Sequence, residues 1–400
     1  MNGTKRLRSI WATLLFAACN HPDPLTQALP TLPPEGGAPL AAAGLLTEEN
    51  FERERVAGPA AQGLVGDYFL RNDKIRAVVQ AGGRFIGPCP YGGNLIDADF
   101  VDAPAGDQLG EVSPFMQLGR TIDFRRGEVV RDGSRGGPAV LRFWGEDVKN
   151  NYIDIPGLGG LARAIGDDYR ADVDLELQAA VTYVLMPGES HISVFYTFFN
   201  TKSVALTTSW GTLSDSGARI EIFHPQSGFG ELGFSEIVAG HQTPTAYVGL
   251  QGEDLAYGIA PIDSVQPMSG VGVPIAGVVV EIYSVQNPLE AFSERGASLK
   301  FSPRGTASRQ IELVLGRDLG GVTTAVHALR QESTAAFSGK VSGVALSRVR
   351  VSISTTDDPP LAVTALSVDQ EGHFSGALPA GNYLFQAESV GPRRGDALPV

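Results

Sequence analysis

Apolar and polar side chains alternate along much of this chain, in short runs that turn residues separate. Residues 67–70 and 75–80 are two such runs, and the polar sequence RNDK between them predicts a hairpin. Residues 179–185 and 192–199 predict a second hairpin, because both runs are rich in β-branched and aromatic residues and the turn sequence MPGESH joins them. The pattern therefore predicts antiparallel strands.

One of these strands is apolar on both faces. In residues 192–199 one face carries Ile192, Val194, Tyr196 and Phe198, and the other carries Phe195 and Phe199. A strand that is covered on both sides within an antiparallel protein implies stacked sheets. Further apolar runs at residues 278–283 and 311–315 continue this region. We therefore predict an all-β fold in which residues 48–320 form a large antiparallel multi-sheet sandwich of the supersandwich kind.

Two features nearer the C-terminus predict a second, smaller unit. Val322, Val326 and Leu329 lie on one face of a predicted connector helix within residues 321–334. Beyond it, residues 349–354 alternate strictly between apolar and polar side chains, which is typical of a short strand with one buried face. We expect residues 335–400 to form a small β-sandwich.

Composition supports a β-rich protein and limits its partners. Glycine and proline are abundant, at 49 and 26 residues, and long charged helical stretches are missing. This favours strands joined by tight turns. The 31 basic and 44 acidic residues give a formal net charge of −13. A chain this acidic is repelled by phosphate backbones and by anionic membrane surfaces, which argues against nucleic acid as a partner.

The first residues have the layout of an export signal. Three basic residues within the first eight precede an apolar run at residues 10–18, and Cys19 follows directly. The run is too short to span a bilayer, which takes roughly 20 apolar residues. The sequence FAAC at residues 16–19 resembles the lipobox of bacterial lipoproteins, with phenylalanine in place of the usual leucine.

The lipobox resemblance implies that residues 1–19 are a signal peptide and that Cys19 becomes the acylated first residue of the mature chain. Residues 20–47 are rich in proline and alanine, which predicts a semi-rigid tether between the membrane and the folded domain. The expected location is the cell envelope, with the lipid anchor in the outer membrane and the protein facing the periplasm or the cell surface.

The last unit carries the sequence GHFSGALPAGNYL at residues 372–384. It resembles the carboxypeptidase regulatory-like domain, in which a Gly-x-Phe strand start is followed by Leu-Pro-x-Gly-x-Tyr. The resemblance implies a prealbumin-like or immunoglobulin-like β-sandwich that is a non-catalytic module. Phe374, Leu378 and Tyr383 are expected to fill its core, while Pro379 and Gly381 form the turn between strands.

Two segments of the large unit, GDYFLRNDKIR at residues 66–76 and PYGGNLIDAD at residues 90–99, look like the leading region of large exported bacterial proteins. In those relatives a β-rich region and a regulatory-like sandwich precede a metal-dependent domain of the polymerase and histidinol phosphatase (PHP) class. This sequence reaches Val400 before any such domain, and its six histidines include no His-x-His pair. We therefore do not carry the hydrolase activity over.

A weaker resemblance covers residues 181–217, which look like the supersandwich of aldose-epimerase-like proteins. Where that group has a His-Thr-Tyr-Phe segment, this chain has TSWGT at residues 208–212. The catalytic histidine of that group therefore has no match, and the resemblance supports the architecture alone.

Two clusters of carboxylates are candidate Ca²⁺ ligands, because hard oxygen atoms at alternating positions can hold this ion. The spacing fits no EF-hand loop, and carboxylates beside Gly, Ala and Pro are more often solvated turn residues or caps, which is the alternative interpretation. The first cluster is Asp97, Asp99, Asp102, Asp107 and Glu111, and the second is Asp167, Asp168, Asp172, Asp174 and Glu176.

Other residues allow both a chemical and a structural interpretation. Cys89 lies in a turn rich in Gly and Pro and is either a nucleophile or, without a nearby histidine, a packed thiol. His224 is either an acid or base that contacts a sugar hydroxyl, or a hydrogen-bonded loop residue. Trp144, Trp210 and Tyr91 could form a platform on which a glycan stacks, although core packing accounts for each of them.

No complete catalytic centre emerges from the sequence. The sequence SDSG at residues 214–217 is interpreted as a turn. The chain has no Gly-x-Ser-x-Gly elbow, no phosphate-binding Gly-Lys-Ser/Thr loop and no Cys-x-x-Cys pair, so it predicts no cofactor and no metal. We expect a non-enzymatic, lipid-anchored envelope protein whose large domain binds a glycan or an envelope protein. Two alternatives stay open: a truncated or divergent N-terminal part of a PHP-type metallohydrolase, and a carbohydrate-active enzyme on a supersandwich.

Overall fold

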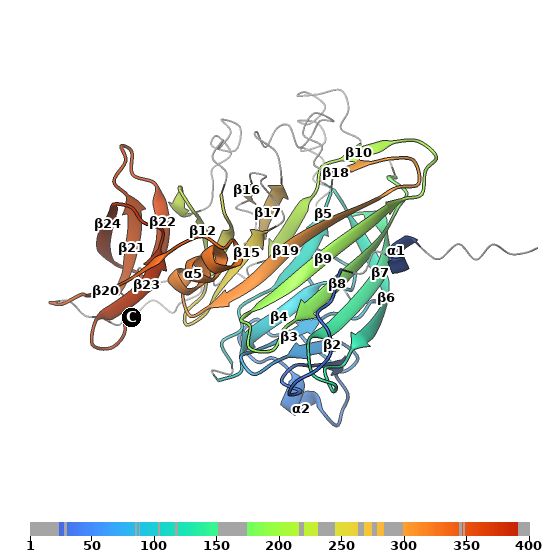
Figure 1. Cartoon of the computed structure of the whole chain (residues 1–400), viewed down its shortest axis with the longest axis horizontal. Helices are drawn as coiled ribbons and strands as arrows, with labels where there is room; N and C mark the ends of the chain where they lie inside the picture. Colours follow the sequence, from blue (N-terminus) through green and yellow to red (C-terminus); the bar gives the residue numbers. More distant parts are fainter. Residues whose placement is uncertain are drawn as a thin grey trace, which may run out of the picture.

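The computed structural model of the chain describes residues 24–27, 30–84, 86–87, 89–102, 105–116, 119–150, 174–215, 220–230, 245–262, 268–273, 278–283, 299–343, 346 and 349–390. Within these residues most of the regular secondary structure is antiparallel β-sheet, arranged as a large domain and a smaller one with a helix between them (Figure 1). This confirms the predicted fold class.

Two sheets build the large domain, and their described strands follow the orders β1-β2-β3-β4-β5-β11-β17-β16 in sheet A and β13-β12-β14-β15-β19-β9-β8-β7-β6 in sheet B. Sheet A comprises β1 (Ala42–Leu45), β2 (Tyr68–Arg71), β3 (Ile75–Val79), β4 (Leu95–Phe100), β5 (Glu111–Phe115), β11 (Gly211–Asp215), β16 (Met268–Val273) and β17 (Val278–Tyr283). Sheet B comprises β6 (Arg120–Arg131), β7 (Ala139–Lys149), β8 (Leu177–Leu185), β9 (His191–Asn200), β12 (Glu221–His224), β13 (Gly228–Phe229), β14 (Val248–Gln251), β15 (Ala256–Pro261) and β19 (Thr306–Gly316). The strands β10 (Leu206–Thr208) and β18 (Leu299–Phe301) form a separate two-stranded ribbon.

Both predicted hairpins are present, as β2 with β3 and as β8 with β9. The buried side chain of Asn72 explains why their turns lie together. Its Oδ1 accepts hydrogen bonds from the backbone N–H of Lys74 and Ile75 within its own turn, at 2.8 and 2.7 Å. Its Nδ2 donates to the carbonyls of Met186 and Glu189 in the other turn, both at 2.7 Å. One amide therefore stabilises the first turn and links sheet A to sheet B.

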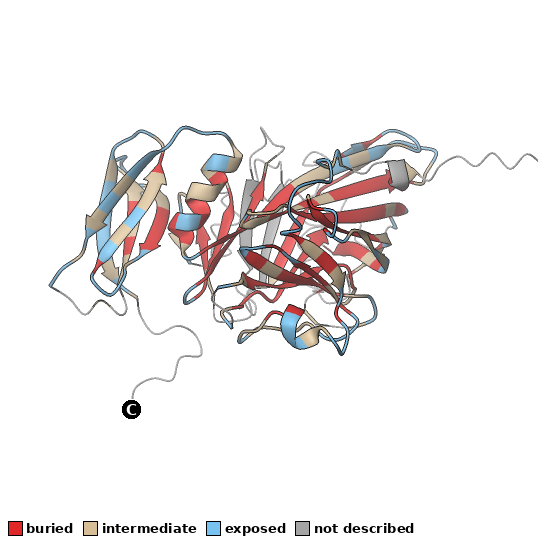
Figure 2. Ribbon diagram, turned by 60° about the horizontal axis from the view of Figure 1, so that its bottom comes forward, coloured by how far each residue is buried: buried red, intermediate tan, exposed pale blue. Residues whose placement is uncertain are grey.

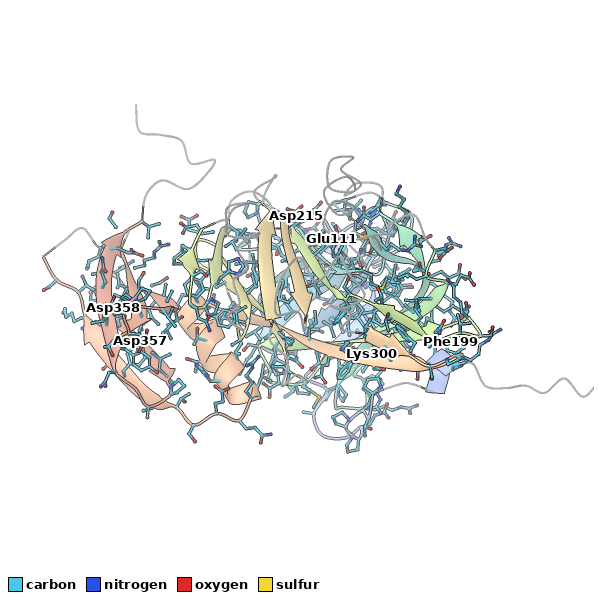
Figure 3. All side chains as sticks on the ribbon, turned by 90° about the horizontal axis from the view of Figure 1, so that it is seen from above. Glu111, Phe199, Asp215, Lys300, Asp357 and Asp358 are labelled. Atoms are coloured by element: carbon cyan, nitrogen blue, oxygen red, sulfur yellow. The ribbon has the colours of Figure 1, made fainter. Side chains whose placement is uncertain are left out.

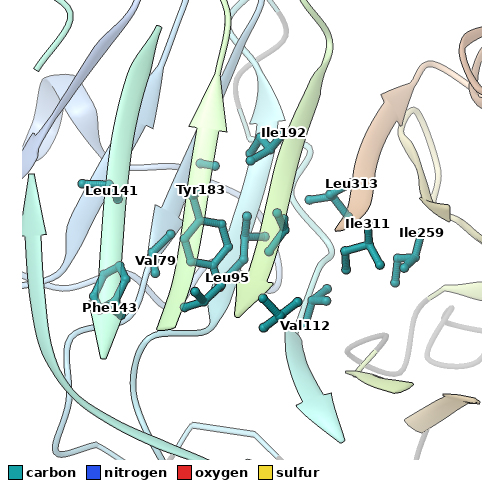
Figure 4. Close-up of a cluster of buried hydrophobic side chains, with 14 of the residues drawn as sticks. Val79, Leu95, Val112, Leu141, Phe143, Tyr183, Ile192, Ile259, Ile311 and Leu313 are labelled. Carbon is teal, nitrogen blue, oxygen red and sulfur yellow. The ribbon is translucent and has the colours of Figure 1, made fainter. Parts of the chain in front are cut away.

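The main hydrophobic core lies between the two sheets (Figure 4). Alternate side chains of β7, β8, β9 and β19 point into it and meet side chains of β3, β4 and β5 from sheet A. Examples are Leu141, Phe143, Tyr183, Ile192 and Leu313 from sheet B, and Val79, Leu95 and Val112 from sheet A. Burial of a side chain of this size contributes about 1.5–3 kcal/mol, so this contact holds the sandwich together.

The predicted tether is wrong at its C-terminal end. Residues 42–45 are strand β1, which pairs with β2 at the edge of sheet A. Further upstream, the short helix α1 (Pro24–Gln27) contacts β8 and β9, and Leu25 is buried there. A second short helix, α2 (Phe51–Glu54), lies on the outside of sheet A. Proline and alanine carry no periodic pattern, so these contacts left no local signal in the sequence.

The predicted helix is present as α5 (Leu319–Leu329), but it does more than connect. Val322 and Val326 are buried as expected, in a cluster that includes residues of β12, β15 and β19 and Ala365 of the small domain. The hydroxyl group of Thr323 lies 2.7 Å from the hydroxyl of Tyr247 in the large domain and donates to Thr364 of the small domain at 2.8 Å. Both domains therefore pack against α5. No helix in the parts of the chain described is long and apolar enough to cross a membrane.

The small domain consists of the sheets β20-β23 and β22-β21-β24. Its strands are β20 (Ala335–Lys340), β21 (Val349–Thr355), β22 (Ala362–Ser367), β23 (His373–Leu378) and β24 (Tyr383–Ser389). Leu378 is buried, Phe374 and Tyr383 pack against the core, and the Tyr383 hydroxyl donates to the carbonyl of Pro379 at 2.9 Å. These contacts confirm the expected core and turn. Figure 2 shows that this domain is less buried than the large one.

Candidate functional site

One face of sheet B points away from the main core and carries mostly polar side chains. Because side chains alternate between the faces of a strand, the neighbours of the core residues in β7, β8, β9 and β19 all point to this side. We call the following residues the polar face: Arg142, Trp144, Thr182, Ser193, Phe195, Thr197, Ser308, Gln310 and Glu312.

The strand register arranges the polar face in rows. One row runs across the four strands through Trp144, Ala180, Thr197 and Ser308. The next runs through Arg142, Thr182, Phe195 and Gln310. The Thr197 and Ser308 hydroxyl groups lie 3.1 Å apart, so polar groups also contact one another across strands. The face therefore combines two aromatic rings with hydroxyl, amide, guanidinium and carboxyl groups. Four of its residues are buried: Arg142, Thr182, Thr197 and Glu312.

A buried carboxyl group lies at one end of the polar face. Glu312 accepts hydrogen bonds from the Ser193 hydroxyl at 2.8 Å and from the Gln310 amide at 2.6 Å. Burial raises the pKa of Glu312 to about 7, although both hydrogen bonds oppose this shift and Glu189 adds to it. His191 lies beside it, with Nε2 3.8 Å from Glu312 Oε2 and Nδ1 3.5 Å from Glu189 Oε2. Burial lowers the pKa of His191, so this end places an imidazole beside a carboxyl group whose pKa is raised.

A tryptophan with two arginines close to its ring lies at the other end. The Cζ of Arg126 lies 4.2 Å from the ring centre of Trp144, and that of Arg142 lies 5.3 Å away. Both distances are within the range of cation–π attraction. Arg142 is almost fully buried and donates a hydrogen bond to the carbonyl of Leu25. Leu25 itself packs against Trp144, Ala180 and Phe199, so α1 covers this end of the face.

The carboxylates of the first acidic cluster do not come together at one point. Asp97 accepts backbone hydrogen bonds from Gln62 and Gly63, both at 2.8 Å, and Asp102 pairs with Arg317 at the surface. Asp99, Asp107 and Glu111 are buried and likewise accept backbone N–H groups. The cap interpretation is therefore right, but four of the five carboxylates are buried rather than solvated.

The second acidic cluster is described only in part. Asp167, Asp168 and Asp172 lie outside the described residues, as does Cys19. Asp174 accepts the backbone N–H of Glu176 at 2.9 Å and pairs with Arg120 at 3.2 Å. Among the residues that the structure describes, three potential metal ligands converge only at Asp369, Glu371 and His373, which are exposed.

Cys89 is a packed thiol rather than a nucleophile. The residue is buried, and its Sγ lies 3.3 Å from the Thr121 hydroxyl. Burial and the nearby Glu111 raise the pKa of Cys89 to about 12, which leaves almost no thiolate at neutral pH. Burial also raises the pKa of Glu111 to about 8, with Asp215 as a further cause.

The three aromatic candidates do not form one platform. Trp210 is in the core, with its ring centre 5.0 Å from that of Tyr196 and 5.7 Å from that of Phe198. Tyr91 is half-buried, and its hydroxyl donates to the carbonyl of Lys149 at 3.4 Å. Trp144 alone belongs to the polar face, where it packs against the small buried cluster of Leu25, Ala180 and Phe199.

Two other predicted loop features are strand residues. His224 is buried at the end of β12. Ser214 and Asp215 are the last residues of β11, paired with both β5 and β17, so the turn interpretation is wrong for them. The remaining two residues of that sequence are not among those described. The alternation of polar side chains in residues 191–197 and 306–312 indicates that each strand has one polar side. Only the pairing of β9 with β19 shows that the two polar sides belong to one face.

Comparison with known proteins gives neighbours in structure alone. The chain matches no known protein family and no curated protein. It is similar to a galactose mutarotase-like protein from Lactobacillus casei, with 12% identity and a TM-score of 0.39 over 63% of this chain and 100% of that chain. A GH36 alpha-galactosidase from Geobacillus stearothermophilus has 12% identity and a TM-score of 0.39 over 66% of this chain and 42% of that chain. A galactose mutarotase-like protein from Clostridium acetobutylicum has 10% identity and a TM-score of 0.33 over 63% of this chain and 96% of that chain. Any function has to be argued from the residues of the polar face itself.

Proposed function

We propose that this protein is a non-enzymatic, lipid-anchored protein of the cell envelope whose large domain binds a glycan on the polar face of sheet B. The observation that carries the proposal is the register of β7, β8, β9 and β19, which places Trp144 and Phe195 among hydroxyl and amide groups on one face. Sugars offer hydroxyl groups around an apolar ring face, and an aromatic ring flanked by hydrogen-bonding groups suits both parts.

Phe195 and Gln310 are the residues to test first. They lie opposite each other across β9 and β19, and both side chains are partly exposed. We expect Phe195→Ala and Gln310→Ala to abolish or strongly weaken binding to an array of neutral oligosaccharides and peptidoglycan fragments. Phe385→Ala is the control, because Phe385 is an exposed aromatic residue of the small domain and does not belong to the polar face. An intact protein that binds no glycan on the array, or equal binding by all variants, contradicts the proposal and favours a protein ligand.

The anchor belongs to the same proposal and is supported by the lipobox-like sequence that ends at Cys19. Intact mass and membrane fractionation of the natively expressed chain test it, alongside Cys19→Ala. We expect a mature chain that starts at an acylated Cys19 and leaves the membrane fraction in the variant. An unmodified or longer chain contradicts the anchor and favours the alternative, a truncated PHP-type metallohydrolase. Downstream coding sequence with a His-x-His segment would support that alternative.

The pair of His191 and Glu312 favours one further candidate, a carbohydrate-active enzyme at the same face. A carboxyl with a pKa of about 7 beside an imidazole 3.8 Å away can donate and accept protons at a sugar. Polarimetry of freshly dissolved aldohexoses, and hydrolysis of glycosides, test for turnover. Activity that Glu312→Gln removes, while glycan binding persists, would replace the binding-only proposal.

A further inference from the structure

The N-terminal segment is held against the large domain at several separate points. Leu25 is buried on the outer face of sheet B against Ala180, Phe199 and Trp144, and its carbonyl accepts a hydrogen bond from the buried Arg142. These contacts join α1 to strands more than a hundred residues away in the sequence. A free spacer would make none of them.

The rest of the segment follows the hairpin between β6 and β7 and then joins sheet A. Arg131 donates to the carbonyl of Pro33 at 2.5 Å, and Arg135 lies 3.5 Å from the Glu35 carboxylate. Gly133 has a φ of +79° and approaches so closely that a Cβ there would lie 2.0 Å from the carbonyl oxygen of Ala41. Residues 42–45 then pair with β2 as the strand β1. Two sheets and one turn therefore contact this stretch of chain.

We propose that residues 24–27 and 30–45, which we call the strap, hold one end of sheet B close to the membrane surface. The inference rests on the proposed acylation of Cys19. Six residue steps separate Cys19 from Leu25, and at about 3.5 Å per residue they reach at most about 20 Å. Figure 3 shows Phe199 and Lys300 at the end of the molecule where α1 lies, and Asp357 and Asp358 in the small domain at the opposite end. The partner of this end is thus the lipid surface, and the small domain points away from it.

Docking of the strap is tested first without any lipid, by acrylamide quenching of tryptophan fluorescence. After signal removal the chain has two tryptophans, and Trp210 is buried in the core, so the quenchable emission comes from Trp144. We expect Leu25→Asp to raise the quenching constant, because it removes the side chain that covers Trp144. Leu40→Asp is the matched control, since Leu40 belongs to the same segment but is exposed. Trp144→Phe verifies the source of the signal. Equal quenching in Leu25→Asp and the wild type overturns the docking.

Orientation at the membrane is tested by energy transfer on the lipidated full chain in vesicles of phosphatidylethanolamine and phosphatidylglycerol that contain a rhodamine lipid. The exposed positions Lys300 and Asp357 are changed singly to cysteine and labelled with a donor dye. Cys89 stays unlabelled, because it is buried and its pKa is raised to about 12.

We expect strong transfer from position 300 and weak transfer from position 357. Leu25→Asp should lower the transfer from position 300, and Leu40→Asp should leave it unchanged. If the chains float with the vesicles but transfer energy equally from both positions, the proposal of a strap is wrong and the lipid anchor is still supported. Chains that fail to float overturn the anchor itself, and with it the membrane role of the strap.

Discussion

Replacing Asp147 by asparagine removes one charge from an ion pair that is buried between β6 and β7. Arg120 donates to Asp147 Oδ2 from Nε at 2.8 Å, and both side chains are almost inaccessible to solvent, at 4% and 1% exposure. The same carboxylate accepts the backbone N–H groups of Leu175 at 3.1 Å and Leu177 at 2.6 Å. It therefore also holds the start of β8.

An asparagine at this position cannot satisfy the same donors. Its amide NH₂ would face either the Arg120 guanidinium or a backbone N–H, so one donor meets another donor and the buried arginine loses its nearest counter-charge. Removal of one member of a buried ion pair costs about 3–5 kcal/mol. At roughly 2–4 °C per kcal/mol for a domain of this size, the Tm of Asp147→Asn should fall by about 6–20 °C.

Calorimetry and urea denaturation measure this loss directly. Asp123→Asn is the matched control, since Asp123 pairs with Arg125 at 2.7 Å but that arginine is 67% exposed. The control should keep the Tm of the wild type, because solvent screens an exposed pair. A loss of less than about 1 kcal/mol in Asp147→Asn would refute the reasoning, because it would mean that the buried arginine tolerates the lost charge.

Three further outcomes follow from the buried polar groups. Burial raises the pKa of Glu312 to about 7 from an ordinary value of 4.5, so its contribution to the free energy of unfolding is fully present below about pH 4.5 and is lost as the pH rises toward 7. Glu312→Gln should therefore make the free energy of unfolding, measured with urea, depend less on pH over this window. A pH dependence equal to that of the wild type contradicts the assignment. Cys89, with its pKa raised to about 12, should not react with iodoacetamide at pH 8 in the folded protein but should react once guanidinium unfolds it. Intact mass measures both reactions. Rapid labelling of the folded chain contradicts the burial of Cys89. Asp318 accepts hydrogen bonds from backbone N–H groups of both α5 and β22. Asp318→Ala should therefore lower the free energy of unfolding by about 1 kcal/mol or more in calorimetry, whereas Asp357→Ala at the surface should leave it unchanged. Equal effects of the two substitutions would mean that these hydrogen bonds do not stabilise the protein.

Strand identity and the helix α5 could be predicted because their signals are local. A period of two with turn residues at its ends predicts β8 and β9 wherever the strands lie, and the spacing of Val322 and Val326 predicts a helix with one buried face. The segment GHFSGALPAGNYL at residues 372–384 also predicted that Phe374 and Tyr383 lie at the core of the small domain, and both pack against it. These features depend on residues that are close together in the chain.

The candidate site could not be predicted in the same way. Ser193 and Glu312 are 119 residues apart, and only the pairing of β9 with β19 brings them together. The acidic residues Asp97 and Glu111 looked solvated because the sequence shows their charge but not the backbone N–H groups that meet them after folding.

The sequence by itself determined that the chain is rich in antiparallel strands, that α5 is a helix and which side chains are apolar enough to form a core. The tertiary structure alone decided that one face of sheet B gathers polar and aromatic groups, and that the proline-rich N-terminal segment lies against that sheet. The reason is physical. Backbone hydrogen bonds are the same for every strand pair, so the order of strands depends on side-chain packing between distant segments. A segment without periodicity, such as residues 24–27 and 30–45, takes its position from arginines and glycines elsewhere in the chain.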